Sequence, residues 1–210
     1  MKIARPKSPP IDAAAVQLRA ELARKITARL PNEGKVTTAI PSLSLYRRNT
    51  PTDCMAVNYE PELVVFVQGE KRINVGGTIH ICDESTILLT SIDLPVVSQV
   101  TQASKEKPIL GMVLKLEMAT VREILSQDEF HTPEAPSAAR GMAVGVTTVD
   151  FLSACARLID LLDTPRDVPF LSTLMHREIL YRLLRGPLGK HLRAIATLGE
   201  QSNRTAKAVT

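Results

Sequence analysis

Two residues of the sequence, His80 and Cys82, have the types and the spacing to bind a metal ion. They alternate along one predicted strand, so both side chains project from the same face and could bind a soft metal. A metal site in a β-domain usually needs two or three histidines and a carboxylate, and no H-x-H motif accompanies His80. We therefore expect neither a metal nor another cofactor, and we expect His80 to be packed or hydrogen-bonded.

The residues that could act as nucleophiles or bases form no catalytic pattern. Cys54, Cys82 and Cys155 each lie in an apolar stretch, where a thiol behaves as a small hydrophobic group. The chain has no G-x-S-x-G, no G-x-G-x-x-G and no Walker motif. His176 and His191 stand beside basic residues on predicted helices, where solvated or interface positions are favoured. The sequence therefore predicts a protein that is not an enzyme.

The composition is typical of a folded, cytoplasmic protein. The 210 residues are 44% hydrophobic and 23% charged, and no apolar run approaches the roughly 20 residues that a membrane helix needs. The three cysteines show no CxxC spacing, which predicts reduced thiols. The formal charge of +4 divides into +5 over residues 1–60, −5 over 61–150 and +4 over 151–210, without the single basic face typical of DNA-binding proteins. We expect no membrane contact.

Hydrophobic periodicity changes from helical to strand-like after the first 35 residues. In residues 11–30, Leu18, Leu22 and Ile26 recur every four residues, which predicts a helix. The next part of the chain has the pattern of about eight short strands separated by Pro, Gly, Asn and Asp, which predicts a sandwich, jelly roll or small barrel. The predicted strands are 38–46, 55–59, 63–68, 72–75, 79–82, 86–90, 96–100 and 109–116, and 142–146 could add one more.

The glycine pair at 76–77 predicts a hairpin, whose register decides which side chains share a face of the sheet. A two-residue turn pairs Ile73 with His80 and mixes apolar and polar residues on both faces. A three-residue turn that includes Thr78 pairs Ile73 with Ile81 and separates the two kinds of residue. Because register usually follows such patterning, we expect the three-residue turn.

Amphipathic helices are predicted at 119–127, 149–162, 171–184 and 188–198, with a Pro- and Ala-rich loop at 131–140. The helix at 171–184 carries six large apolar residues in two adjacent stripes. It must bury this face against the strands, against helix 149–162 or against a second subunit. Core packing and a dimer face both remain open for it. The residues predicted for a dimer interface are Leu174, Ile179, Leu180 and Leu183.

Several short motifs follow one another in the order found in a known protein family. No single motif is specific, but their collinear order between residues 38 and 204 resembles the N-terminal domain of AraC-type transcriptional regulators. The motifs are Ile40-Pro41, Leu45-Tyr46-Arg47, Tyr59-Glu60-Pro61, VQGEKR at 67–72, LLTSIDLPV at 88–96, ARL at 156–158 and REILYRLLRG at 177–186.

The resemblance implies an α+β fold, in which a cupin-like antiparallel β-barrel or jelly roll follows an N-terminal helix and precedes a helical subdomain. The implied boundaries are 1–35 for the N-terminal helix, 36–147 for the barrel, 148–200 for a helical dimerisation subdomain and 201–210 for the start of a linker. In such regulators a helix-turn-helix domain follows and reads DNA. We expect this chain to be a piece of such a regulator, and the alternative is a chain that has lost its DNA reader.

The resemblance also implies a homodimer that senses a small-molecule effector and meets DNA only through the absent domain. Polar groups among apolar strands could orient the effector, and we predict Gln68, Arg72 and His80 as ligand-binding residues. His80 and Cys82 stand where relatives tend to carry aromatic residues, which leaves the effector open. Two other functions remain open: a metal-dependent enzyme of the cupin class, and a dimerisation module without a ligand.

Overall fold

Strand β5 (Glu62–Gln68) forms the middle of the fold because five consecutive residues of its apolar run are buried. The computed structural model describes residues 2–6, 12–127 and 141–196. In the larger, six-stranded sheet β5 pairs antiparallel with two neighbouring strands. The strands of this sheet, in spatial order, are β11 (Met142–Val146), β8 (Thr86–Thr90), β5, β10 (Ile109–Lys115), β3 (Leu43–Arg48) and β2 (Gly34–Thr37).

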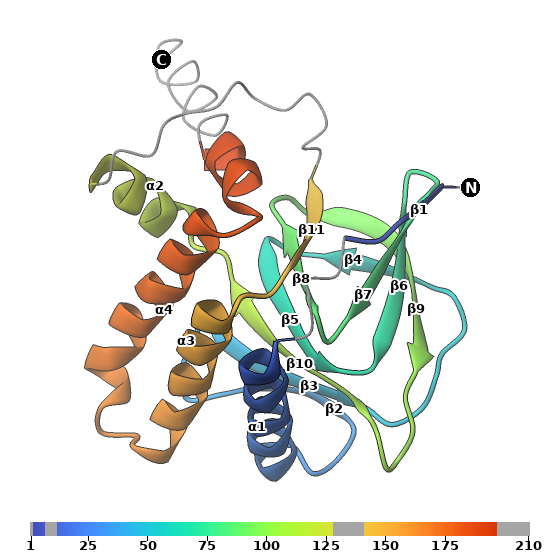
Figure 1. The fold of residues 1–210 in the computed structure, drawn as a ribbon, viewed down its shortest axis with the longest axis horizontal. Helices are drawn as coiled ribbons and strands as arrows, with labels where there is room; N and C mark the ends of the chain where they lie inside the picture. Colours follow the sequence, from blue (N-terminus) through green and yellow to red (C-terminus); the bar gives the residue numbers. More distant parts are fainter. Residues whose placement is uncertain (1, 7–11, 128–140, 197–210) are drawn as a thin grey trace.

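A five-stranded sheet covers one face of the six-stranded sheet (Figure 1). All its neighbouring strands are antiparallel except the first pair. The two sheets form a sandwich that is not closed into a barrel, so the α+β class is confirmed in this more open form. In spatial order the strands are β1 (Lys2–Ala4), β7 (Thr78–Asp83), β6 (Glu70–Val75), β9 (Leu94–Gln102) and β4 (Met55–Tyr59).

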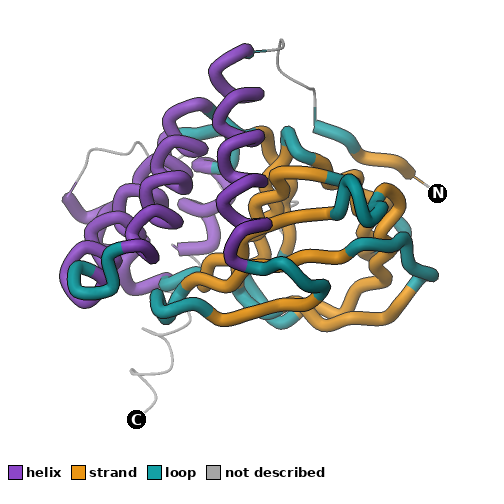
Figure 2. The backbone as a smooth tube through the Cα atoms, turned by 90° about the horizontal axis from the view of Figure 1, so that it is seen from below, coloured by secondary structure: helices purple, strands orange, loops and turns teal. Residues whose placement is uncertain are grey.

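Helices cover the other face of the six-stranded sheet (Figure 2). Because side chains alternate along β5, Leu63 and Val65 pack against the helices, whereas Val64 and Phe66 pack against the second sheet. The helices are α1 (Ala13–Arg29), α2 (Met118–Gln127), α3 (Val149–Asp160) with a 3-10 turn at Leu161–Asp163, and α4 (Val168–Arg185). No helix in the described part of the chain is both long and apolar enough to cross a membrane.

Local sequence signals set several helix boundaries. The carboxylate of Asp12 accepts a hydrogen bond from the Ala14 amide at 2.9 Å, and the hydroxyl of Thr148 caps α3 by accepting one from the Phe151 amide. Leu22 and Ile26 are fully buried on α1, which confirms the predicted N-terminal helix. Residues 189–196 are helical, in agreement with the start of the last predicted helix. The end of that helix, the loop at 131–140 and the linker at 201–210 lie outside the described residues.

Only residues 43–46 of the strand predicted at 38–46 lie in a strand, because residues 38–42 form the turn between β2, which was not predicted, and β3. The hydroxyl of Thr38 accepts a hydrogen bond from the Ile40 amide at 3.1 Å and lies 3.0 Å from the Leu43 carbonyl oxygen. Pro41 cannot donate to a strand ladder, which also favours a turn here. The sequence pattern therefore predicted β3 but missed β2 and the turn, which backbone hydrogen bonds between Thr38, Ile40 and Leu43 also hold.

The hairpin between β6 and β7 contradicts the predicted three-residue turn. Gly76 and Gly77 alone make the turn, with φ values of 55° and 82°, and Ile73 lies opposite His80. Two consecutive positive φ angles are typical of a type I′ turn, whose twist matches that of the two strands of a hairpin. The prediction was wrong because it assumed that one face of the hairpin is purely apolar, whereas Lys71 and His80 share a face with the buried Ile73.

Gly69, between β5 and β6, lies where no side chain fits. Its φ is +85°, and an added Cβ would lie 2.7 Å from the Cβ of Ile109 and 2.8 Å from the carbonyl oxygen of Gln102. We expect Gly69→Ala to lower the free energy of unfolding by about 3 kcal/mol, because both backbone strain and overpacking oppose it. Urea denaturation measures the change.

The matched control is Gly76→Asn, at a turn position with positive φ and nothing within 4 Å of an added Cβ. Asparagine tolerates this backbone conformation, so we expect a loss of less than about 1 kcal/mol. Equal losses in the two variants would contradict the assignment of Gly69 to a steric constraint.

Candidate functional site

The face of the β6–β7 hairpin that looks toward the six-stranded sheet carries a lysine. Ile73 on β6 is fully buried between the sheets, and because strand side chains alternate, Lys71 projects from the same face. Cys82 and His80 on β7 lie directly opposite Lys71 and Ile73. A lysine, a histidine and a thiol therefore enter the layer between the two sheets.

The ammonium group of Lys71 lies near two tyrosine rings from other strands. Its Nζ is 5.9 Å from the ring centre of Tyr46 on β3 and 5.4 Å from that of Tyr59 on β4. Both distances are short enough for a ring to attract a cation. We call the group formed by Lys71, Tyr46, Tyr59, His80 and Cys82 the inner site.

No ion pair with Lys71 is found among the residues that the structure describes. The carboxylates nearby are engaged elsewhere: Glu62 lies 3.9 Å from Lys35, and Glu70 lies 3.9 Å from Arg72. Burial lowers the pKa of Lys71 below its ordinary value. An ammonium group that has lost part of its hydration and has no carboxylate partner favours the approach of an anion.

The other titratable groups of this layer favour their neutral forms. Burial raises the pKa of the Cys82 thiol to about 12, so the thiol is protonated at neutral pH and is a poor nucleophile. Burial also raises the pKa of Tyr59 and of Glu62, and it lowers the pKa of His80. No group of three or more His, Cys, Asp and Glu residues in the described ranges could hold a metal ion. The arrangement therefore suits noncovalent binding.

The structure separates the three residues predicted to bind a ligand. His80 belongs to the inner site. Gln68 donates a hydrogen bond from its amide to the carbonyl oxygen of Pro108 at 2.6 Å, which ties the end of β5 to the start of β10. Arg72 projects from the opposite face to Lys71 and is 51% exposed. The ligand-binding roles of all three stay predictions, and the structure brings only His80 together with Lys71.

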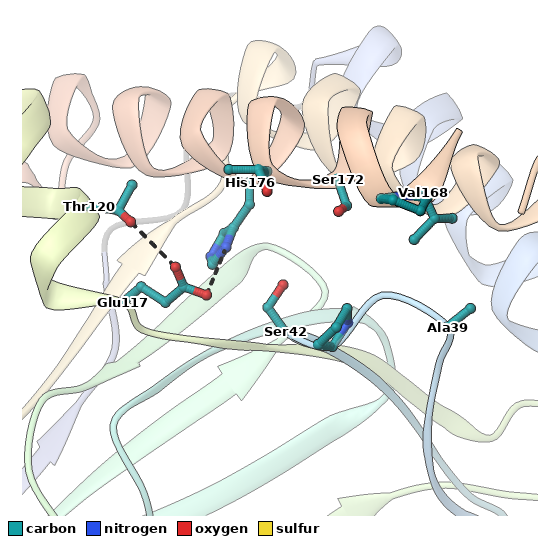
Figure 3. A pocket seen from close by; sticks show the side chains of 10 residues that line it. Ala39, Ser42, Glu117, Thr120, Val168, Ser172 and His176 are labelled. Atoms are coloured by element: carbon teal, nitrogen blue, oxygen red, sulfur yellow. Dashed lines mark hydrogen bonds and ion pairs between the residues drawn. The ribbon is translucent and has the colours of Figure 1, made fainter. Parts of the chain in front are cut away.

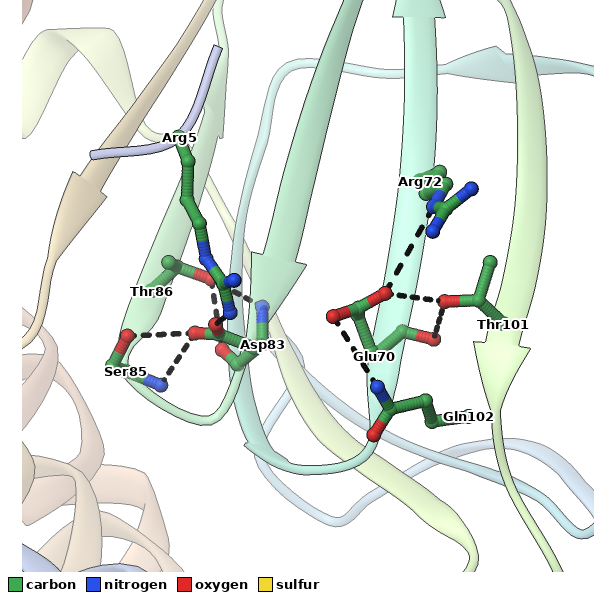
Figure 4. A network of polar contacts seen from close by, with 8 residues as sticks. All are labelled: Arg5, Glu70, Arg72, Asp83, Ser85, Thr86, Thr101 and Gln102. Atoms are coloured by element: carbon green, nitrogen blue, oxygen red, sulfur yellow. Dashed lines mark hydrogen bonds and ion pairs between the residues drawn. The ribbon is translucent and has the colours of Figure 1, made fainter. Parts of the chain in front are cut away.

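Two buried carboxylates occupy the outer face of the hairpin (Figure 4). Glu70 lies opposite Asp83, and its Oε1 accepts a hydrogen bond from the Thr101 hydroxyl at 2.8 Å. Arg5, in the N-terminal segment, donates to Asp83 at 2.5 Å. Burial alone would raise the pKa of Asp83, but hydrogen bonds from Ser85 and Arg5 hold it below its ordinary value. These carboxylates have partners within the chain, so the outer face is a structural network.

Three of the four residues predicted for a dimer interface lie in the core of one chain. Ile179, Leu180 and Leu183 are at most 2% exposed, because α4 packs this face against α3 and the rest of the helix-side core. Leu174 is 51% exposed. Of the four predicted residues, only Leu174 is therefore exposed enough to contact a second subunit. A charged residue at position 180 would instead disturb the core of the chain itself.

Sequence reasoning missed the residues at the centre of the inner site. Lys71, Ile73 and Val75 alternate along β6, so a lysine on an otherwise apolar face was a visible signal. Tyr46 and Tyr59 carried no such signal, because their nearness to Lys71 depends on how two sheets pair. The sequence therefore indicated a lysine on an apolar strand face, but it did not indicate which side chains surround that lysine.

Two solved structures of ToxT from Vibrio cholerae are similar to this chain. ToxT bound to (E)-4-(8-methylnaphthalen-1-yl)but-3-enoic acid gives a TM-score of 0.50 at 11% identity, and the match covers 71% of this chain and 57% of that chain. Wild-type ToxT bound to an unsaturated fatty acid gives 0.47 at 13% identity, with 68% and 52% covered. The chain spans a little over half the length of these ToxT chains. No curated protein matches it.

The family assignment follows from the sequence match and agrees with the fold. A family model described as the AraC-type transcriptional regulator N-terminus matches residues 39–191, which is most of the chain. The matched range begins at the turn before β3 and covers strands β3 to β11 and α4, whereas β1, β2 and α1 lie before it. The sandwich with helices on one face is the α+β, cupin-like fold that the sequence predicted. The chain therefore belongs to the family of AraC-type transcriptional regulator N-terminal domains.

Proposed function

We propose that this chain is the effector-sensing part of a transcriptional regulator, and that Lys71 binds the anionic group of the effector. The observation that carries this proposal is the half-buried ammonium group of Lys71, which faces two tyrosines and has no ion pair among the described residues. A bound anion would supply the missing countercharge, and the low polarity of the surroundings would strengthen that interaction.

The surroundings of Lys71 favour an effector with an apolar body and one acidic group. Phe66, Ile73 and Val100 belong to the apolar cluster between the sheets, and Tyr59 packs against it. The ToxT structures named above contain an unsaturated fatty acid and an aryl-substituted butenoic acid, which are molecules of this class. For this chain the proposal rests on Lys71 and its neighbours.

The proposed mechanism is a shift between two arrangements of sheets and helices. An effector that binds one arrangement better would populate it, in proportion to its differential affinity. The readout would be DNA binding by a helix-turn-helix domain outside the 210 residues. The role of this chain would then be regulatory.

We also propose that the chain forms a homodimer through the outward face of α4. Phe170 is 73% exposed and Leu174 is 51% exposed. Residues four apart on a helix are neighbours, so these side chains form one apolar patch. In a twofold interface the same patch of two copies meets, so the apolar patch of one copy would pack against the identical patch of the other.

Octanoate and 1-octanol, which differ in charge but share an apolar chain, test the proposed anion site. We expect wild type to bind octanoate more tightly than octanol, and Lys71→Met to lose about tenfold in octanoate affinity, because a charge-assisted contact disappears. Isothermal titration calorimetry measures both affinities. Methionine keeps the length of the side chain, so the fold is preserved.

The matched control is Arg72→Met, which removes a positive charge one residue away on the outer face of the same strand. Because the proposed effector lies at the inner site and Arg72 projects from the other face, the proposal gives Arg72 no ligand contact, and we expect this variant to leave octanoate affinity unchanged. The proposal is overturned if wild type does not prefer octanoate to octanol, or if Lys71→Met and Arg72→Met weaken octanoate binding equally.

The pH dependence of octanoate binding gives an independent prediction. Binding needs charged Lys71, and burial lowers the pKa of Lys71 in the free protein, so affinity falls as pH rises through that lowered pKa. The fall should begin clearly below the ordinary lysine pKa of about 10.4, and it should be absent in Lys71→Met. Titrations at several pH values between about 7 and about 10 measure it. A flat profile for wild type would count against Lys71 as the contact.

The dimer proposal is tested with a charge in the exposed patch. We expect Leu174→Glu to raise the dimer dissociation constant by about tenfold or more, because two carboxylates would meet across the twofold axis. Val97→Glu, at a 41% exposed position on β9, is the matched control and should leave it unchanged. Sedimentation equilibrium measures both. An unchanged association of Leu174→Glu, or a monomeric wild type, would refute the interface.

A further inference from the structure

A cavity of about 430 Å³ lies between α4 and the end of the six-stranded sheet (Figure 3). Three elements form it: the turn between β2 and β3, the start of α2 and the first half of α4. It lies on the helix side of that sheet, so it is distinct from the inner site. The polar residues that line it are Ser42, Glu117, Thr120, Ser172, Thr173 and His176.

His176 is directed from α4 toward this cavity and is only 5% exposed, so of the solvated or interface positions expected for it, the solvated one is wrong. Its Nδ1 lies 3.7 Å from Oε1 of Glu117, and the ring forms a hydrogen bond with the Lys115 backbone carbonyl. Nε2 has no hydrogen-bond partner among the residues that the structure describes. A buried polar atom without a partner is unfavourable, so this nitrogen gains stability from a donor that enters the cavity.

The charges around the cavity determine which ligand suits it. No lysine or arginine is among the described residues that line it, and Glu117 contributes a carboxylate that is half exposed. Thr120 donates a hydrogen bond to Oε2 of Glu117 at 3.3 Å, which orients the carboxylate (Figure 3). Burial lowers the pKa of His176, so its ring is neutral at pH 7 and one ring nitrogen accepts a hydrogen bond. The cavity therefore offers acceptors for a donor-rich ligand.

We propose that this cavity is a second ligand site, which binds a small organic ammonium compound. The carboxylate of Glu117 binds the ammonium group, and Nε2 of His176 accepts a hydrogen bond from the ligand after a small rotation of the ring. The hydroxyl groups of Ser42 and Ser172 face each other across the cavity and complete its polar wall. The apolar atoms of Val168 and Pro169 contact the carbon skeleton of the ligand.

This second site is independent of the effector proposal, because its chemistry is opposite to that of Lys71. The inner site selects an anion, whereas the cavity at Glu117 selects a cation. A ligand there contacts α4, α2 and the turn before β3 at once. Its binding energy therefore holds α4 in one position against the sheet.

The experiment uses benzylamine, benzyl alcohol and benzoate, which have the same ring and differ in charge. The His176 ring is followed by NMR of histidine-labelled protein during titration with each compound. We expect benzylamine to shift the His176 signals at millimolar concentration and to bind more tightly at this position than the alcohol. We expect benzoate to leave those signals unchanged, even if it binds at Lys71.

Two variants, each of which removes one negative charge at or near α2, distinguish a direct contact of Glu117 with the ligand from a general effect of charge on binding. Glu117→Gln should weaken benzylamine about tenfold, the loss of one charge-assisted contact. Glu123→Gln is the matched control, since Glu123 is 57% exposed on α2, outside the cavity, and pairs with Arg177 at 2.9 Å. It should leave the affinity unchanged. Both replaced side chains are exposed, so both proteins should fold.

The proposal is overturned by any of three results. The first is that none of the three compounds shifts the His176 signals. The second is that benzoate binds there as tightly as benzylamine. The third is that Glu117→Gln and Glu123→Gln have the same effect on benzylamine. Because none of these results involves Lys71, each is separate from the outcome of the octanoate experiments.

Discussion

The structure depends on one constraint: the six-stranded sheet must be covered on both faces. The five central residues of β5 are apolar and buried, so Leu63 and Val65 need one partner layer, and Val64 and Phe66 need another. Helices supply the first layer and the second sheet supplies the other. A shift of one residue in register would exchange the two faces, but because both are apolar, the neighbours of β5 must fix the register instead. Polar residues at the ends of its neighbouring strands, such as Thr90, do so through hydrogen bonds to Glu62.

The same constraint explains why Lys71 stands out. On the outer face of the β6–β7 hairpin, the carboxylates of Glu70 and Asp83 are buried, but each has donors from neighbouring residues. On the inner face, the half-buried Lys71 lies near two aromatic rings and has no ion pair among the described residues. The carboxylates of the outer face thus have partners, whereas Lys71 on the inner face has lost hydration without gaining an ion pair among the described residues. This loss lowers the stability of the fold. Such a cost is expected where function, not stability, selects the residue.

Local patterns predicted the parts of the fold that depend on local interactions. The helix at α1, the strand at β5 and most other strands follow from periodicity, caps and turn residues. The hairpin register could not be predicted from its own residues, because the face shared by Ile73 and His80 is mixed, and only the two-glycine turn settles the pairing. The surroundings of Lys71 were also out of reach, since they depend on the pairing of distant strands.

The contacts of α4 could not be predicted from the sequence either, because they also involve elements that are distant in the chain. The apolar pattern of α4 indicated that Ile179 and Leu183 needed a partner, but it could not distinguish the core of the chain from a second subunit. The structure places both in the core and leaves Phe170 outside. His176 was expected in solvent or at an interface because a basic residue, Arg177, follows it in the sequence. It is buried because the start of α2 and the turn before β3 cover it, and these elements are remote in the sequence.

α4 is therefore the element through which the proposed sites would influence one another. One side of it carries Ile179 in the core, a second side carries His176 at the cavity, and a third carries Phe170 and Leu174 in the solvent. A helix moves as a rigid unit, so a ligand that fixes His176 also fixes the orientation of the outward patch. The inner site reaches α4 only through the six-stranded sheet, whose close packing transmits small displacements between its two faces. Coupling then requires that each ligand prefer one position of α4, because a ligand with equal affinity for both positions shifts nothing.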